Sequence, residues 1–134
     1  MKRGVVLFAH GSRDPQWARP FEVLSKELGQ KLVGVPVRLA YLEMMRPTLA
    51  EAIAALAAEG TRSVRIVPVF FGQGAHVRED LPKLVSALAA AHRDLELILE
   101  KPIGEQPTVI AAIAEAIAAG VPSTRGSSAP GRKR

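Results

Sequence analysis

The stretch VVLFAHGSRDP, residues 5 to 15, places five apolar residues directly before a histidine, a glycine, a serine, an arginine and an aspartate. An apolar run of this kind is typical of a buried strand, which would end at His10. Asp14 and Pro15 suit the N-cap and the first position of a helix. The stretch therefore predicts a strand, a polar loop and a helix in immediate succession.

The rest of the chain repeats this alternation. Strand-like runs, rich in Val and Ile, cover residues 4–9, 35–41, 64–71 and 95–99. Apolar residues at helical spacing lie between and after these runs. They are Trp17, Phe21, Leu24 and Leu28 in the first helix, Leu49, Ile53 and Leu56 in the second, Leu84, Val85 and Leu88 in the third, and Ile110, Ile113 and Ile117 in the fourth.

Proline and glycine set the expected helix ends. The second helix opens at Pro47 and stops at Gly60, and the fourth runs from about residue 106 to 120 with its isoleucines inward. The third helix is expected to begin near residues 80 and 81, because Pro82 is tolerated in the first turn of a helix.

Strands that alternate with helices are parallel, since each crossover returns the chain to the same end of the sheet. We predict an α/β fold, a doubly wound four-stranded parallel sheet with strand order 2-1-3-4 and helices on both faces. Residues 1–120 are expected to form a single domain, and the basic tail 121–134 is expected to be disordered. Ligands of such sheets bind outside the carboxyl ends of the strands, where the strand order reverses.

Three residues that commonly bind metals follow three of the predicted strands. His10 comes after the first strand, Glu43 near the end of the second, and His76 just beyond the third. In the order 2-1-3 their side chains can converge at one edge of the sheet. Two imidazoles and one carboxylate suit a divalent ion such as Co²⁺, Fe²⁺, Ni²⁺ or Zn²⁺, and they leave coordination positions open for chemistry.

Each of these residues also has a plain structural interpretation. A single histidine at a strand end is more often a hydrogen-bonded structural residue than a ligand, and Glu43 alone would be an exposed loop carboxylate. The third histidine, His92, falls near the end of a predicted helix, where the helix dipole favours it. The joint placement of three ligand-type residues, with Gly11, Gly72 and Gly74 beside the histidines, favours a metal site.

The composition excludes several classes of function. Hydrophobic residues make up 48% of the chain, yet no run approaches the roughly 20 apolar residues of a membrane span, so we expect a cytoplasmic protein without membrane attachment. The chain has no cysteine, so any metal is held by nitrogen and oxygen. The net charge of +5 favours acidic partners, but an aromatic content of 4% and a basic run confined to the tail disfavour nucleic acid. The loop HGSRDP lacks the glycine patterns that bind phosphates.

Three segments carry a family resemblance: AHGSRDP at residues 9–15, YLEMMRPTLAEAI at 41–53 and VPVFFGQGAHVREDLP at 67–82. In this order and spacing they resemble the short-form sirohydrochlorin chelatases, single-domain class II enzymes that insert Co²⁺ or Fe²⁺ into sirohydrochlorin. The resemblance covers residues 4 to about 120. It implies that His10, Glu43 and His76 bind and deliver the metal. It also implies a homodimer, because the long forms of the family carry two such domains in tandem.

Metal insertion removes two pyrrole protons while the ring nitrogens replace the other ligands of the ion. The site therefore needs no permanently bound cofactor, only a weakly held metal and a nearby base. His10 or His76 can be that base, and Glu43 adds the negative charge that holds a dication. Sirohydrochlorin carries many carboxylates, and the candidates to bind them are Ser12, Arg13, Arg46, Arg78 and the backbone amides near Gln73 and Gly74.

Three points stay open at this stage. A non-catalytic carrier of metal or tetrapyrrole would use the same crevice and the same ligands. Arg46 and Arg78 individually fit a solvated surface role equally well. Co²⁺ and Fe²⁺ prefer similar ligands, so the residues do not separate the cobalamin pathway from the sirohaem pathway.

Overall fold

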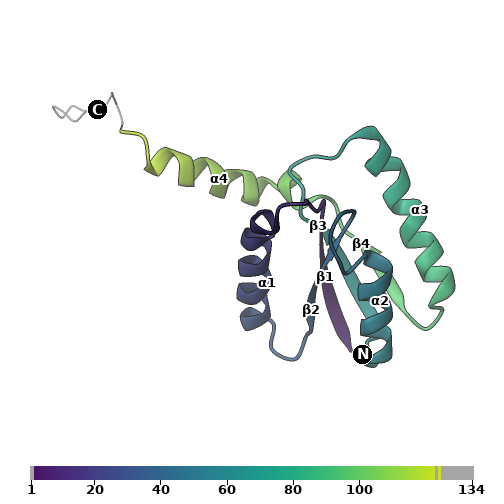
Figure 1. Ribbon diagram of the computed structural model, residues 1–134. Coiled ribbons are helices and arrows are strands. Elements are labelled where there is room, and N and C mark those ends of the chain that lie inside the picture. The colour runs from purple at the N-terminus through teal and green to yellow at the C-terminus, as the bar shows by residue number, and fades with distance from the viewer. Residues whose placement is uncertain (1, 123, 125–134) are drawn as a thin grey trace.

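The computed structural model describes residues 2–122 and 124, and a four-stranded parallel sheet in the order β2-β1-β3-β4 lies at its centre (Figure 1). The strands are β1 (Arg3–Ala9), β2 (Val37–Tyr41), β3 (Ser63–Pro68) and β4 (Glu96–Leu99). The predicted fold class and strand order are confirmed. The second strand begins two residues later than expected, and the third ends three residues earlier.

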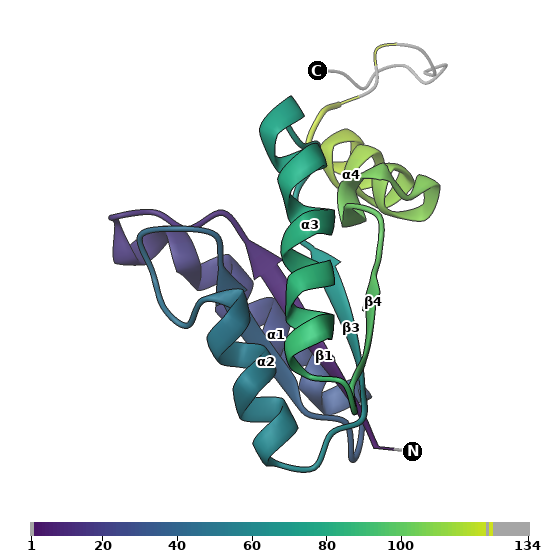
Figure 2. The same cartoon turned by 90° about the vertical axis from the view of Figure 1, so that its right-hand side faces the viewer.

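Helices connect and follow these strands. They are the 3-10 turn η1 (Pro15–Ala18), α1 (Arg19–Lys31), α2 (Leu49–Ala58), α3 (Ala75–Ala91), the 3-10 turn η2 (Ile103–Glu105) and α4 (Pro107–Ala119). Helix α1 covers one face of the sheet, whereas α2 and α3 cover the other (Figures 1 and 2). Helix α4 lies on neither face and projects from the upper end of the sheet in Figure 1.

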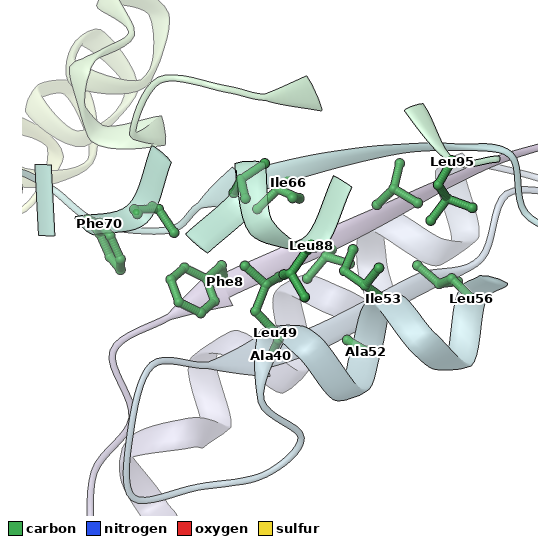
Figure 3. Close-up of a cluster of buried hydrophobic side chains, with 14 residues drawn as sticks. Phe8, Ala40, Leu49, Ala52, Ile53, Leu56, Ile66, Phe70, Leu88 and Leu95 are labelled. Carbon is green, nitrogen blue, oxygen red and sulfur yellow. The ribbon is translucent and has the colours of Figure 1, made fainter. Parts of the chain in front are cut away.

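The core is built around β1, whose continuous run of apolar residues is buried on both faces of the sheet. Because side chains alternate along a strand, Phe8 points to the α2 and α3 side, where it packs in one cluster with Ile53 and Leu88 (Figure 3). Ala9 points to the other side and joins a smaller cluster with Tyr41. The central strand thus packs against both layers, and this packing fixes the position of its carboxyl end.

The first helical segment begins as Asp14 and Pro15 predict, but in two parts. The Asp14 carboxylate accepts a hydrogen bond from the Gln16 amide at 3.0 Å and caps η1, and the α-helix proper starts at Arg19. The Trp17 and Phe21 rings pack 4.6 Å apart on the smaller cluster. Further along the same helix Leu24 is exposed, and α1 buries no residue completely.

Helix α2 packs as its pattern predicts, with Leu49, Ile53 and Leu56 fully buried. It begins at Leu49, two residues after the expected start at Pro47. Thr48 and Glu51 form a capping box, in which each side chain accepts a hydrogen bond from the other residue's amide.

The prediction for the third helix was wrong at its start. Helix α3 begins at Ala75, so His76 lies in its first turn and Pro82 lies well inside the helix. An interior proline removes one backbone hydrogen bond. The apolar face that runs from Val77 through Leu81 to Val85 packs on the core over the whole length, and this burial offsets that loss.

The prediction for the fourth helix was wrong in orientation. Ile110, Ile113 and Ile117 of α4 are exposed, and the helix buries no residue at all. No helix in the part of the chain that the structure describes is long and apolar enough to cross a membrane. The tail predicted from residue 121 onward lies outside the described residues, except for Val121, Pro122 and Thr124.

Candidate active site

The carboxyl ends of three strands meet at one edge of the sheet. Ala9 pairs with Tyr41 across β1 and β2, and Phe8 pairs with Pro68 across β1 and β3. The segments that lead to His10, Glu43 and His76 therefore leave the sheet side by side, as the strand order predicts.

The loops after β1 and β2 touch through their backbones. The Leu42 amide donates to the Ala9 carbonyl at 2.9 Å, and the Glu43 amide donates to the His10 carbonyl at 3.0 Å. Gly11 has a φ of +97°, and a Cβ at this position would lie 1.9 Å from the Glu43 carbonyl oxygen. Only glycine fits such a contact, so Gly11 keeps His10 and Glu43 adjacent.

The residue after Glu43 has a strained backbone. Met44 has a φ of +66°, a conformation that costs a residue with a side chain about 1–2 kcal/mol. The Met45 amide closes the turn by donating to the Glu43 carbonyl at 2.8 Å. Strain of this kind persists only where the surroundings enforce it, and it is concentrated at functional sites.

His10 is exposed and lies against an aromatic ring. Its imidazole centroid is 4.4 Å from that of Phe70, and the two planes are inclined by 32°. Phe70 is buried and comes from the segment just after β3. The stacking limits the orientations that the imidazole can adopt.

Glu43 and His76 line one cavity of about 310 Å³ at this edge. Asp80 lines it too, one helical turn after His76 on α3. Asp80 was not among the predicted ligands, because the sequence pattern predicts a helix that starts at about that residue. The remaining lining is apolar and consists of Leu42, Val77, Leu81 and Leu84.

The three predicted ligands are neighbours rather than a closed cage. His10 is joined to Glu43 through the backbone, but it does not line the cavity that Glu43 shares with His76. Within residues 2–122 no group of three or more His, Asp or Glu side chains lies close enough to hold a metal ion. Binding of one ion by all three residues therefore stays a prediction.

The first two residues predicted to bind the substrate lie in the loop after β1. The Ser12 hydroxyl oxygen accepts a hydrogen bond from the Asp14 amide at 3.1 Å, which leaves its own proton free to donate. Arg13 is exposed and forms no ion pair with any residue that the structure describes. Both side chains therefore keep donors that no described residue engages.

The other candidates divide between α2 and α3. Arg46 forms an ion pair with Glu51 of the capping box, so its charge is partly committed to the fold. Arg78 donates to the Gln73 carbonyl at 3.1 Å and lies beside Gly74, the N-cap of α3. The first amides of α3 have no partner within the helix and suit a carboxylate.

A buried tyrosine lies directly below this edge. Burial raises the pKa of the Tyr41 phenol, and the Glu22 carboxylate raises it further. The Tyr41 amide donates to the Pro47 carbonyl at 2.9 Å, which ties the end of β2 to the segment before α2. The raised pKa keeps the phenol neutral at neutral pH, and the backbone of Tyr41 supports the turn that carries Glu43.

Curated relatives extend over most of this chain. A sirohydrochlorin cobaltochelatase of Methanosarcina acetivorans is 33% identical over 110 residues, which are 77% of this chain and 85% of the relative. A sirohydrochlorin cobaltochelatase of Saccharolobus solfataricus is 32% identical over 111 residues, 75% of this chain and 82% of the relative.

Solved structures of the same fold are also similar. A CbiX protein from Marinobacter aquaeolei is 29% identical with a TM-score of 0.77, and the match covers 87% of this chain and 95% of that protein. SirB from Bacillus subtilis, solved with Fe³⁺, is 25% identical with a TM-score of 0.75, and the match covers 91% of this chain but 49% of SirB. The model of the CbiX family matches residues 4–119, and the chain belongs to this family.

Proposed function

We propose that this protein is a lyase-type metal chelatase that inserts Co²⁺ or Fe²⁺ into sirohydrochlorin, in cobalamin or sirohaem biosynthesis. The names of its curated relatives support the reaction, and solved SirB structures with Fe³⁺ and with cobalt support the metals. The observation that carries the proposal is the cavity lined by Glu43 and His76, directly beside His10, at the carboxyl edge of the sheet.

His10, Glu43 and His76 are the proposed metal ligands. All three side chains are exposed, so an ion bound by them keeps positions open for the ring nitrogens. Asp80 adds a second carboxylate to the cavity and strengthens its attraction for a dication. The metal is a substrate in this scheme and leaves with the product. Ni²⁺ suits the same donor set and is the third candidate.

The proton balance assigns a role to the imidazoles. The ion enters as a dication, two pyrrole N–H bonds break, the metal forms bonds to the ring nitrogens, and two protons leave. A neutral imidazole can accept one proton at a time and return it to water. We assign this role first to His10, because Phe70 holds its ring in place at the end of the central strand.

The polycarboxylate and the flat ring need different surfaces. Several groups supply hydrogen-bond donors for the carboxylates. They are Arg13, Arg78, the Ser12 hydroxyl and the first amides of α3, next to Gln73 and Gly74. Arg46 contributes less, because Glu51 already binds it. Large exposed apolar side chains surround the same edge and suit the face of a macrocycle: Leu42, Met44, Phe71 and Leu84.

We also propose that the active form is a homodimer in the cytoplasm. The carboxyl edge of a single copy is too shallow to enclose a macrocycle, and ligand pockets bury most of the surface of their ligand. This chain matches about half of SirB, so a second copy could supply what the other half of SirB supplies. The cytoplasmic location remains the expectation drawn from the sequence.

Absorbance spectra during incubation with sirohydrochlorin test the reaction. Protein is held far below the tetrapyrrole under anaerobic conditions, with Co²⁺, Fe²⁺ and Ni²⁺ in parallel and protein-free samples as controls. We expect many equivalents of metallated product per protein, above the uncatalysed rate. A spectral change that stops at one equivalent would instead indicate a carrier, and no change would contradict both functions.

A further inference from the structure

The His10 imidazole, to which we assign the proton-accepting role, is exposed at the end of the central strand. None of the side-chain hydrogen bonds among the described residues involves this ring. An exposed side chain without such a bond changes rotamer within picoseconds to nanoseconds. A base that accepts protons efficiently must instead be oriented toward the N–H bond that breaks. Another contact must therefore orient the imidazole.

The ring of Phe70 supplies that contact. The two ring centroids are 4.4 Å apart and the planes are inclined by only 32°, so the rings meet through their faces. The lone pair and the N–H bond of an imidazole lie in the plane of its ring. A contact with the face therefore restrains the His10 ring without occupying either nitrogen.

Phe70 is itself fixed from several directions. It is 4% exposed, belongs to the main core cluster and lies with its ring centroid 6.0 Å from that of Phe8 (Figure 3). The Val69 amide donates to the Phe8 carbonyl at 2.7 Å, and the Gly104 amide donates to the Phe70 carbonyl at 2.9 Å. A Cβ on Gly104 would lie 2.5 Å from the Phe71 Cα, so this close contact anchors η2 on the Phe70 segment.

Phe70 acts on one side of the candidate site only. The cavity that Glu43 shares with His76 is lined by neither Phe70 nor His10. A change at Phe70 therefore leaves the Glu43 and His76 side of the site as it is. The two sides can be distinguished by separate measurements of metal binding and of the chemical step.

We propose that Phe70 is a positioning residue that holds the His10 imidazole in the orientation in which it accepts the pyrrole protons. The inference rests on the proposed function and names a further residue on which the rate of that reaction depends. Phe70 is buried beneath the edge and acts through His10 alone. Because Gly104 holds the Phe70 backbone, the orientation of His10 also depends on η2, more than 90 residues later in the chain.

The size of the effect follows from the strength of such a stack. A stacked aromatic pair is favoured by a factor of about 2 to 10 beyond the burial of its area. Without the stack, the fraction of imidazoles in the productive orientation falls by a similar factor. We therefore expect the loss of the Phe70 ring to lower kcat by about threefold to tenfold.

NMR of the histidine ring protons tests the orientation without metal or tetrapyrrole. The chain has three histidines, and the signals that disappear in His10→Ala belong to His10. Protons above the face of an aromatic ring are shifted upfield. We expect Phe70→Leu to move the His10 signals downfield and to leave those of His76 and His92 in place. Gly104→Ala, which displaces the Phe70 backbone, should move the His10 signals in the same direction by a smaller amount.

Initial rates of Co²⁺ insertion test the consequence for the reaction. Phe70→Leu should lower kcat by about threefold to tenfold and change the KM for Co²⁺ by less than about twofold. Phe70→Tyr keeps the flat ring and should retain most of the wild-type kcat. Leu56→Ala is the control for lost stability, because Leu56 belongs to the same core cluster but contacts Gly4 at the opposite end of β1. At a temperature where circular dichroism shows it folded, Leu56→Ala should keep the wild-type kcat and the wild-type His10 signals.

The outcomes separate this inference from the proposed function. His10 signals that Phe70→Leu leaves unmoved would overturn the positioning role and leave the reaction standing. A raised KM for Co²⁺ with an unchanged kcat would overturn it in favour of a role in metal binding. An equal fall of kcat in Leu56→Ala would overturn it in favour of general destabilisation. An absence of turnover in the wild type would contradict the proposed function, and the NMR comparison would still decide whether Phe70 orients His10.

Discussion

Helices α2 and α4 have similar sequences and opposite surroundings. Both are rich in alanine with a large apolar residue every third or fourth position, yet Leu56 of α2 is 0% exposed whereas Ile117 of α4 is 65% exposed. The difference lies in how each helix is entered. Thr48 pairs with Tyr41 at the end of β2 and caps α2, so that helix returns along the sheet, whereas η2 directs α4 away from it. An amphipathic pattern predicts an apolar face, and the connection decides which surface covers it.

The largest effect expected from this comparison is on stability. Leu56→Ala should lower the free energy of unfolding by about 2–5 kcal/mol, because it leaves a cavity in the main core. Ile113→Ala should change the free energy of unfolding of the dilute monomer by less than about 0.5 kcal/mol, because this side chain is not part of a buried core. Urea unfolding at several protein concentrations measures both. An equal, concentration-independent loss would mean that α4 packs on its own sheet.

The contact that directs α4 gives the next effect. Gly104→Ala should cost about 1–3 kcal/mol, since the added methyl group would overlap the backbone of Phe71. Gly29→Ala, in the last turn of α1 with nothing within 4 Å of its Cβ position, should gain up to about 1 kcal/mol. Thermal unfolding compares the two variants. An unchanged unfolding temperature for Gly104→Ala would show that this contact does not fix the direction of α4.

The entry to α2 should show a smaller effect. Thr48→Ala removes the side chain that caps α2 and should cost about 0.5–2 kcal/mol. The residue at the same position of α4, Gln106, makes no capping hydrogen bond through its side chain, so Gln106→Ala should cost less than about 0.5 kcal/mol. Chemical denaturation of both variants under one set of conditions is sufficient. Equal costs would show that capping does not distinguish the two helices.

The smallest effect concerns Tyr41, at the point where β2 turns toward α2. Because its pKa is raised in the folded state, the neutral phenol contributes stability that is present below pH 10 and is lost as pH rises through the folded pKa. Tyr41→Phe should therefore lose less stability than the wild type between neutral pH and strongly alkaline pH. Unfolding curves at matched pH values measure the difference, and parallel curves would contradict the assignment.

Much of the fold could be predicted from the sequence because strand residues such as Val6 and Ile66 are buried where continuous apolar runs indicate burial. The start of α3 could not, since Pro82 resembles a helix start, while only the tertiary packing of Val77 shows that the helix begins earlier. The placement of Ile113 depends on the η2 anchor, which no local pattern records.

The candidate site could also be predicted only in part. The strand order alone predicts that His10 and Glu43 are neighbours, because both follow adjacent strands. Asp80 lines the cavity because α3 begins early enough to place it one turn after His76, and this could not be predicted once the helix start was misplaced. The stacking of Phe70 on His10 depends on three residues that continue past β3 as a loop rather than as a strand.

The rate of Co²⁺ insertion into sirohydrochlorin by His10→Ala, compared with His92→Ala, tests the carboxyl-edge site most directly. His92 ends α3 with its amide bonded to the Leu88 carbonyl, away from the edge, so its loss leaves the site unchanged. We expect His10→Ala to fold normally and to lose activity about 100-fold or more, because a metal ligand and a base are both removed, and we expect His92→Ala to keep the wild-type rate. Wild-type rates for both folded variants would contradict the account.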